Sequence, residues 1–332
     1  MRSLGGRAAR VVRPGWCLLV TDRTVDRLHG GAARASLRRA GFVPATVALA
    51  AGERSKTLSN VGRLLRVLAG AGADRGTPVI ALGGGVVTDL AGFVAAVYAR
   101  GIPWVAVPTT LLGMADASVG GKTGVDLPEG KNLAGAFHPP VLIHLAPETL
   151  RTLPARHLRN GLAEIAKMEI LGGLRTGLPA VRRLAAEDPA RAARRAAAAK
   201  AALVARDPFE RKGIRVLLNL GHTVGHALEA ATGYDGRVLH GEAVAVGLVA
   251  AARVAEGRGL LRAGEAAALA EALRSLGLPV ALPRGVAGRA VLSFARTDKK
   301  RAAGEIRMVL PRSAARAVVA AVPPAELAAA LE

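Results

Sequence analysis

The alternation of short apolar segments with helix-forming segments over the first 145 residues restricts the fold of this chain most strongly. The segments "WCLLVTD", "ATVALA", "TPVIALGGG" and "WVAVP" have the length and apolar composition of buried strands. We expect helices between them, from about Thr24 to Ala40, from Thr57 to Ala71 and from Thr88 onward. Because neighbouring parallel strands need a crossover that usually contains a helix, this alternation predicts a mainly parallel, doubly wound sheet.

The composition changes after "TLRTLP", where long segments rich in Ala, Leu and Arg begin. These residues favour helices, and Gly and Pro interrupt them at intervals that separate one helix from the next. We therefore predict a mainly α-helical second half with a short strand near "EIRMVLP". The expected domains are an α/β domain at residues 1–148 and a helical domain at residues 149–332.

Cysteine content and the apolar runs indicate a compartment. Cys17 is the single cysteine, which excludes an internal disulfide and fits a reducing environment. The start of the chain has arginines but no sustained apolar core, unlike a signal peptide. The longest apolar run, near "AVAVGLVAAA", ends at Arg253 and is too short for a membrane span. We expect a soluble cytoplasmic protein.

The formal net charge of +21 raises the alternative of a nucleic-acid-binding protein. However, the arginines are scattered through Ala-rich helices, aromatic residues make up only 3%, and no known nucleic-acid-binding motif is present. A solvated basic surface explains the charge more simply, and it would also attract a small anionic substrate. Steep salt dependence of DNA retention would instead favour nucleic-acid binding.

Three glycines, Gly83, Gly84 and Gly85, stand between a predicted strand and a predicted helix in "IALGGGVVTDLAG". Glycines there let the backbone approach a phosphate, and a helix N-terminus favours its negative charge. The segment is not the G-x-G-x-x-G fingerprint, so a dinucleotide site and a purely structural turn both remain open.

The next segment, "VPTTLLGMADASVGGKTGVDLPEGKN", is rich in glycine and hydrogen-bonding side chains. The polar residues are Thr109, Thr110, Asp116, Ser118, Lys122, Lys131 and Asn132. We interpret it as a loop that follows the carboxyl end of a strand, where open α/β sheets bind ligands. A solvated loop without a function would not need two Gly-Lys pairs, so a binding site is favoured here.

His222 and His226 are four residues apart in an apolar, helix-forming run, so they share one helix face. They could hold a metal jointly, divide their functions, or be core histidines. His240 begins another expected helix, and Glu164 lies on an apolar helix face with Lys167 one turn on. A catalytic metal site commonly uses three protein ligands, often His with a carboxylate, and a buried carboxylate usually has a cation as partner. These residues therefore favour a site over a set of core histidines.

The chain resembles the 3-dehydroquinate synthase family from about Val20 to Leu310. The matching motifs, in order, are "GGGVVTDLAGF", "RGI", "VPTTLLGMADASVGGKTGV", "GKNLAGAFHPP", "TLPARHLRNGLAEIAK", "RVLLNLGHTVGHALEA", "HGEAVAVG" and "DKKRAAGEIRMVLP". The glycine turn alone would not separate this family from the iron-type alcohol and glycerol dehydrogenases, which share the fold. The resemblance implies a Rossmann-like NAD-binding domain followed by the helical domain.

The resemblance also implies site residues. The divalent metal, Zn²⁺ or Co²⁺, would be bound by Glu164, His222 and His240. NAD would contact Asp22, Glu53, Lys56, Gly84, Gly85, Val86, Asp89, Thr109, Thr110, Lys122, Lys131 and Thr152. The substrate's carboxylate, hydroxyls and phosphate would meet Arg100, Asp116, Lys122, Lys131, Asn132, Lys167, Lys200, Arg215, Asn219, His226, Lys299 and Lys300. The family further suggests a homodimer.

The implied activity is a lyase reaction of the shikimate pathway, in aromatic amino acid biosynthesis. It converts 3-deoxy-D-arabino-heptulosonate 7-phosphate to 3-dehydroquinate and phosphate, with transient hydride transfer to NAD. The alternatives are a related sugar-phosphate cyclase, such as an aminodehydroquinate or valiolone-type synthase, and a metal-dependent alcohol dehydrogenase. Arg215, Asn219 and His226 match the dehydroquinate pattern, which argues against the first alternative. The Lys/Arg set argues against the second.

Some positions depart from the family. Glu169 stands where the family usually has Gly, and His144 where it usually has Asp. One extra residue lies between Lys200 and Arg215, and another between His226 and His240. Since Glu164, His222 and His240 would complete a three-ligand site, we expect His226 to contact the substrate instead of the metal.

Overall fold

The computed structural model describes residues 1–298 and 305–332, and it forms two compact units, Met1–Pro154 and Ala155–Glu332. The boundary expected after residue 148 falls within the 3₁₀ helix η5 (Pro147–Thr152), shortly before the division between the units. The predicted substrate residues Lys299 and Lys300 lie outside the described residues.

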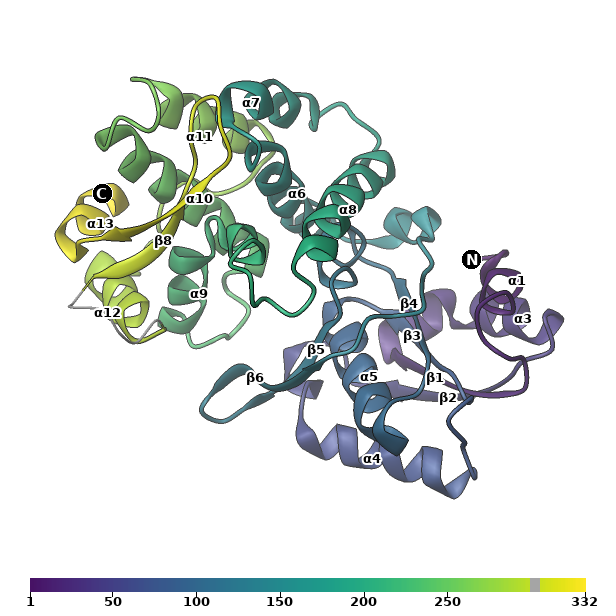
Figure 1. Cartoon of the computed structure of the whole chain (residues 1–332). Helices are drawn as coiled ribbons and strands as arrows, with labels where there is room; N and C mark the ends of the chain where they lie inside the picture. The colour runs from purple at the N-terminus through teal and green to yellow at the C-terminus, as the bar shows by residue number, and fades with distance from the viewer. Residues whose placement is uncertain (299–304) are drawn as a thin grey trace. The chain divides into compact units, whose positions relative to one another are not determined.

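The first unit is built on a sheet of five parallel strands in the order β2-β1-β3-β4-β7 (Figure 1). The strands are β1 (Trp16–Asp22), β2 (Val43–Leu49), β3 (Val79–Gly83), β4 (Trp104–Pro108) and β7 (Leu142–Ile143). The three central strands, β1, β3 and β4, are buried along nearly their whole length. Such burial on both faces explains why their sequences are continuous apolar runs without polar alternation.

Successive residues of β1, β3 and β4 enter two different cores, one on each face of the sheet. Leu18 and Val20 pack with helices α4 (Leu58–Gly70) and α5 (Gly85–Val97). Leu19 lies in the other core, with α1 (Leu4–Ala8) and α3 (Gly31–Arg39). Helices on both faces of a parallel sheet define the doubly wound class, so the predicted fold of this half is confirmed.

Two details of the first unit differ from the expectation. The helix expected from Thr24 is divided into α2 (Arg23–Val25), the π-helical turn η1 (Asp26–Gly30) and α3. Helix α5 begins at Gly85, three residues before the expected start. Its first turn therefore includes one glycine of the triplet, and Gly84 is its N-cap.

The segment expected as a long loop contains an antiparallel hairpin, β5 (Lys122–Leu127) and β6 (Gly130–Phe137) (Figure 1). Gly124 and Gly135 face each other across it, and a Cβ on Gly124 would lie 2.6 Å from the carbonyl oxygen of Ala134. The glycines permit close approach of the two strands. The prediction of a loop took these glycines as loop-forming and therefore missed the hairpin. Before the hairpin lies the π-helical turn η4 (Gly113–Ala117), and η2 (Glu53–Ser55) and η3 (Tyr98–Arg100) are short 3₁₀ turns.

The second unit is mainly helical, as predicted. Its helices are α6 (Ala155–Ile170), α7 (Leu174–Arg183), α8 (Pro189–Arg206), the 3₁₀ turn η6 (Arg215–Asn219), α9 (His222–Ala231), α10 (His240–Gly257), α11 (Glu265–Ser275), α12 (Gly288–Asp298) and α13 (Pro324–Leu331). The strand expected near "EIRMVLP" is β8 (Ile306–Leu310), which pairs antiparallel with β9 (Val318–Val322). Among the described residues, we find no helix with the length and hydropathy of a membrane span.

Candidate functional site

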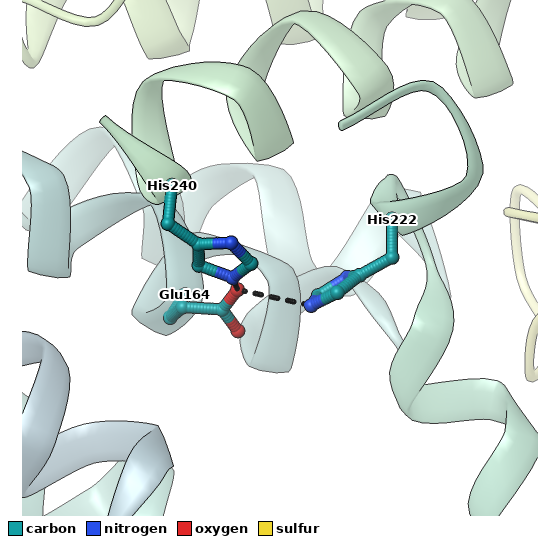
Figure 2. A group of neighbouring side chains, drawn as sticks. All are labelled: Glu164, His222 and His240. Carbon is teal, nitrogen blue, oxygen red and sulfur yellow. Dashed lines mark ion pairs between the residues drawn. The ribbon is translucent and has the colours of Figure 1, made fainter. Parts of the chain in front are cut away.

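Three helices of the second unit bring Glu164, His222 and His240 together (Figure 2). Glu164 lies on the inner face of α6 and is 0% exposed. The two histidines are the first residues of α9 and α10. Figure 2 shows both imidazole rings directed toward the carboxylate from different sides. The sequence prediction that these three side chains belong together agrees with this arrangement.

Glycines hold the three helices close enough for the side chains to meet. A Cβ on Gly241, next to His240, would lie 1.9 Å from the backbone oxygen of Asn160 on α6. The amide of Gly241 also donates a hydrogen bond of 2.6 Å to the side chain of Asn160. Between α9 and α10, a Cβ on Gly247 would lie 1.9 Å from the carbonyl oxygen of Gly221. Residues with larger side chains at these positions would force the helices apart.

The distances within the group fit ligands of one small divalent cation. Oε1 of Glu164 lies 3.5 Å from Nε2 of His222 and 3.4 Å from Nε2 of His240. Nitrogen and oxygen ligands about 2.1 Å from a tetrahedral zinc ion lie roughly 3.4 Å from each other. Among the described residues, neither buried oxygen of Glu164 accepts a hydrogen bond of acceptable geometry. A buried carboxylate in this condition, with two ring nitrogens facing it, has the donor set that Zn²⁺ or Co²⁺ takes.

The electrostatics of the group keep two of the candidate ligands in forms that could bind a metal. Burial alone would raise the pKa of Glu164, but the ammonium of Lys167 and the two imidazoles outweigh it and hold this pKa well below its usual range. Lys167 itself is buried and forms an ion pair with Glu164. Burial, followed by the charge of Lys167, lowers the pKa of His222 to about 3. Glu164 is therefore ionised and His222 neutral at physiological pH.

His240 has a carboxylate at each ring nitrogen. Its Nδ1 lies 3.0 Å from Oε2 of Glu229, on the opposite side of the ring from Glu164. Burial would lower the pKa of His240, but these two carboxylates outweigh it and raise the pKa to about 10. Glu229 is not among the site residues expected from the sequence. The available signal was its spacing, because it lies three residues after His226 and seven after His222, on the same face of α9.

His226 is exposed on that face of α9. Its ring centroid lies 5.2 Å from that of His222 and 6.1 Å from that of His240. A second group of potential ligand atoms consists of His226, Glu229 and His240. Proximity therefore does not separate a substrate-contacting His226 from a metal-binding one, and its predicted role stays a prediction.

The other predicted substrate residues of the second unit lie on α8 and η6. Lys200 and Arg215 are both buried, and Asn219 is half-buried. The loop between α8 and η6 is organised by Asp207, which sequence reasoning missed. Its carboxylate accepts hydrogen bonds from the backbone amides of Arg211, Lys212, Ile214 and Arg215 at 2.8–3.2 Å. Asp207 thereby fixes the start of η6.

The unusual Glu169 also has a partner. Its carboxylate accepts a hydrogen bond of 2.8 Å from Arg195 on α8, and Arg195 also pairs with Glu187. The departure from glycine at this position therefore adds an ion-pair link between α6 and α8.

In the first unit, the predicted NAD-binding residues gather at the carboxyl edge of the sheet. Asp22 ends β1, Gly84 and Gly85 follow β3, and Thr109 and Thr110 follow β4. The chain reverses direction across the sheet between β1 and β3, since β2 lies on one side of β1 and β3 on the other. Ligands of open α/β sheets bind at such a switch point. Val86 belongs to the first turn of α5 at the same edge.

Several predicted ligand contacts of the first unit contact each other. Lys56 is buried, donates a hydrogen bond of 2.7 Å to Asp89 and also contacts the side-chain oxygen of Asn132. Lys131 lies 3.8 Å from the carboxylate of Glu53. Burial would lower the pKa of Lys56, but Asp89 and Glu53 outweigh it and raise the pKa. This network attaches the β5–β6 hairpin to α5 and η2.

The remaining predicted residues of this unit are less enclosed. Lys122, Arg100 and Thr152 are exposed, and Asp116 is half-buried in η4. The Thr152 hydroxyl lies 2.9 Å from Nε2 of His29. Arg100 has a φ of 65°, in the left-handed region that L residues rarely adopt. Such strain at an exposed arginine is consistent with a functional position.

Comparisons with known proteins agree with this geometry. The family model described as 3-dehydroquinate synthase N-terminal matches residues 46–160, and the C-terminal model matches residues 161–301. A 3-dehydroquinate synthase of Symbiobacterium thermophilum is 50% identical over 301 residues, which cover 89% of this chain and 83% of that protein. One of Xanthomonas campestris pv. campestris is 48% identical over 340 residues, covering 99% of this chain and 91% of that protein.

A solved structure is also similar along the whole chain. It is the 2-epi-5-epi-valiolone synthase ValA of Streptomyces hygroscopicus subsp. jinggangensis, with NAD⁺ and Zn²⁺ bound. It superposes with a TM-score of 0.89 at 32% identity, over 100% of this chain and 93% of that one. Both family models, high identity to the relatives and nearly complete coverage lead to one conclusion: the chain belongs to the 3-dehydroquinate synthase family.

Proposed function

We propose that this protein converts 3-deoxy-D-arabino-heptulosonate 7-phosphate to 3-dehydroquinate and phosphate, with NAD and one divalent metal ion. The observation that carries the proposal is the fully buried Glu164, which faces Nε2 of both His222 and His240 in a chain of this family. The relatives named above carry the same activity in their names.

The metal would be held by Glu164, His222 and His240. Zn²⁺ or Co²⁺ in a three-ligand site acts as a Lewis acid toward a substrate oxygen. Lys167 keeps Glu164 ionised by pairing with it, so the carboxylate needs no deprotonation before it binds a cation. The low pKa of His222 likewise leaves its lone pair available. The surroundings of Glu164 and His222 thus keep both side chains in the protonation states that bind a metal ion.

NAD would bind at the carboxyl edge of the first unit's sheet. NAD supplies a reversible hydride acceptor. The N-terminus of α5 favours the negative charge of a pyrophosphate, and the glycines before it leave the backbone open to close approach. A side chain at position 84 would have little space, since a Cβ on Gly84 would lie 3.2 Å from Cγ2 of Thr110. Asp22, Glu53, Lys56, Gly85, Val86, Asp89, Thr109, Lys122, Lys131 and Thr152 are the other proposed contacts.

The substrate is an anion with a carboxylate and a phosphate, and the proposed contacts are largely cationic. In the second unit these are Lys167, Lys200 and Arg215, with Asn219 and His226 as hydrogen-bond partners. In the first unit they are Arg100, Lys122, Lys131 and Asn132, with Asp116. Charge-assisted hydrogen bonds from such groups orient a substrate with two anionic groups and disfavour uncharged ones. His226 is exposed, so it can hydrogen-bond to the substrate or transfer a proton.

One assay tests the proposal. The purified protein, supplied with the heptulosonate phosphate and a divalent metal, should release phosphate and form dehydroquinate only when NAD is present. NAD should not be consumed, because the hydride returns to the substrate. Stoichiometric accumulation of NADH would indicate a dehydrogenase. Preferential turnover of an analogue that lacks the carboxylate would indicate a related sugar-phosphate cyclase.

The homodimer implied by the family resemblance and the cytoplasmic location expected from the sequence both stay predictions. Size-exclusion chromatography with light scattering tests the dimer directly: a mass near twice the 33.9 kDa of the chain is expected.

A further inference from the structure

We propose that Glu229 is a positioning residue that fixes the ring of His240, so that its Nε2 lone pair is presented to the metal. The proposal rests on the proposed metal site of Glu164, His222 and His240. It concerns a residue outside the predicted ligand set and predicts a measurable effect on metal affinity.

The geometry of the His240 ring supports this role. Nδ1 of His240 lies 3.0 Å from Oε2 of Glu229, a hydrogen-bonding distance, whereas Nε2 lies 3.4 Å from Oε1 of Glu164. An ionised carboxylate can only accept hydrogen bonds, so Nδ1 must carry the proton in this contact. In the neutral ring, Nε2 then has the lone pair. Glu229 therefore selects the tautomer that can bind a metal beside Glu164.

His222 has a parallel arrangement. Its Nδ1 lies 3.2 Å from the backbone oxygen of Leu220, and its Nε2 faces Glu164 at 3.5 Å. Both imidazoles thus have an oxygen acceptor at Nδ1 and the same carboxylate at Nε2. Acceptors at the outer nitrogen orient metal-binding histidines and raise their basicity. A carboxylate does so more strongly than a carbonyl, so His240 should be the more basic ligand.

The location of Glu229 in α9 also supports this role. It is 6% exposed and lies in the last turn of α9, where the helix dipole disfavours negative charge. Burial also disfavours the ionised form. Neither burial nor the helix dipole favours an ionised carboxylate at this position, whereas the contact with Nδ1 of His240 does.

The test measures metal binding without substrate, so its result is independent of whether the proposed reaction occurs. Apoprotein of the wild type, Glu229→Ala and Glu229→Gln would be titrated with Zn²⁺ in competition with a chromophoric chelator. Loss of an acceptor of this kind typically weakens metal binding about 10- to 100-fold, and we expect Glu229→Ala to fall in this range. Glu229→Gln keeps an oxygen that can accept from Nδ1, so it should recover part of the affinity. Glu271→Gln, an exposed glutamate on α11, is the matched control and should bind as the wild type does.

A second measurement separates positioning from a general loss of structure. Long-range ¹H–¹⁵N correlation spectra of the histidines in the Zn²⁺-loaded wild type should show His240 protonated at Nδ1 and bound through Nε2. Glu229→Gln, the gentler substitution, should keep the fold and this tautomer. Wild-type Zn²⁺ affinity in both folded variants would overturn the proposal. So would a stoichiometry of two Zn²⁺ in the wild type that falls to one in Glu229→Gln, since Glu229 would then be a ligand in the group with His226 and His240.

Discussion

The ring centroids of His222 and His226 lie 5.2 Å apart with their planes at 87°, on one face of α9. Only His222 belongs to the group with Glu164, whereas His226 belongs to the group with Glu229. The i, i+4 spacing that suggested a joint site therefore places the two rings beside different carboxylates. We expect the two histidines to serve different functions.

This difference predicts different outcomes for two alanine variants. His222→Ala should lose both the metal and the activity, because it removes one of the three proposed ligands. His226→Ala should keep close to one metal ion per chain and lose mainly turnover, because it removes the proposed substrate contact. Elemental analysis of the purified variants, combined with steady-state kinetics, distinguishes the two cases. A metal-free His226→Ala protein would show that His226 is itself a ligand.

The strands of the first unit could be predicted because their signal is local. A run such as "WCLLVTD" is buried on both faces, so its own composition reveals it. The β5–β6 hairpin was missed because its glycines act across strands: Gly124 is needed for the close approach of Ala134, which a linear reading does not show. The division of the helix after Asp22 into α and π turns has no comparable signal in the composition.

The candidate metal ligands could be proposed from the motif resemblance, but the contacts of Glu229 with His240 and of Asp207 with the start of η6 could not. Glu229 contacts His240 from eleven positions earlier in the chain, across the turn between two helices. Asp207 accepts hydrogen bonds from four backbone amides. Every residue except proline has a backbone amide, so the sequence does not show which amides Asp207 will contact. Both residues act through the conformation of others, so their functions emerge only when the helices and loops are placed in space.

Arg215→Ala should lower kcat/KM while leaving metal content unchanged. Arg215 is 3% exposed, donates a hydrogen bond of 2.9 Å to the carbonyl of Pro208 and begins the turn fixed by Asp207. If its guanidinium also binds the substrate carboxylate or phosphate, its loss should decrease transition-state stabilisation by about 2–4 kcal/mol. Thermal unfolding of the variant controls for loss of structure. Near-normal turnover would exclude Arg215 from substrate binding.

His144 predicts a pH dependence of stability. Its ring is 2% exposed, and neither ring nitrogen has a hydrogen-bond partner among the described residues. Burial, together with nearby positive charge, lowers its pKa from 6.5 to about 4. Below pH 6.5, His144 binds a proton in the unfolded chain but stays neutral in the folded chain. The free energy of unfolding therefore falls as the pH decreases toward 4. The loss should total about 3 kcal/mol over this range, from 1.36 kcal/mol per pKa unit.

His144→Leu removes this titration and replaces two buried nitrogens with apolar atoms of similar volume. At pH 7 the variant should be as stable as the wild type or more so. Between pH 6.5 and 4, the free energy of unfolding of the variant should decrease less steeply than that of the wild type. The two slopes should differ by the uptake of about one proton on unfolding. Urea unfolding of both proteins at several pH values gives the difference, and other titrating groups cancel in the comparison. Parallel curves for the two proteins would contradict the assignment.

Gly247→Ala should destabilise the second unit and weaken metal binding together. A Cβ there would lie 1.9 Å from the carbonyl oxygen of Gly221, the residue before His222, so α9 and α10 must separate. Overpacking of this kind typically destabilises by about 1–3 kcal/mol.

Gly257→Ala, at the end of the same helix, is the matched control, since nothing lies within 4 Å of its added Cβ. That variant should be neutral or more stable by roughly 0.5–1 kcal/mol, because alanine favours the helix over glycine. Denaturant unfolding of the two variants measures their stability, and Zn²⁺ titration measures their metal affinity. Equal metal affinity in the two variants would show that the spacing of α9 and α10 does not determine the geometry of His222 and His240.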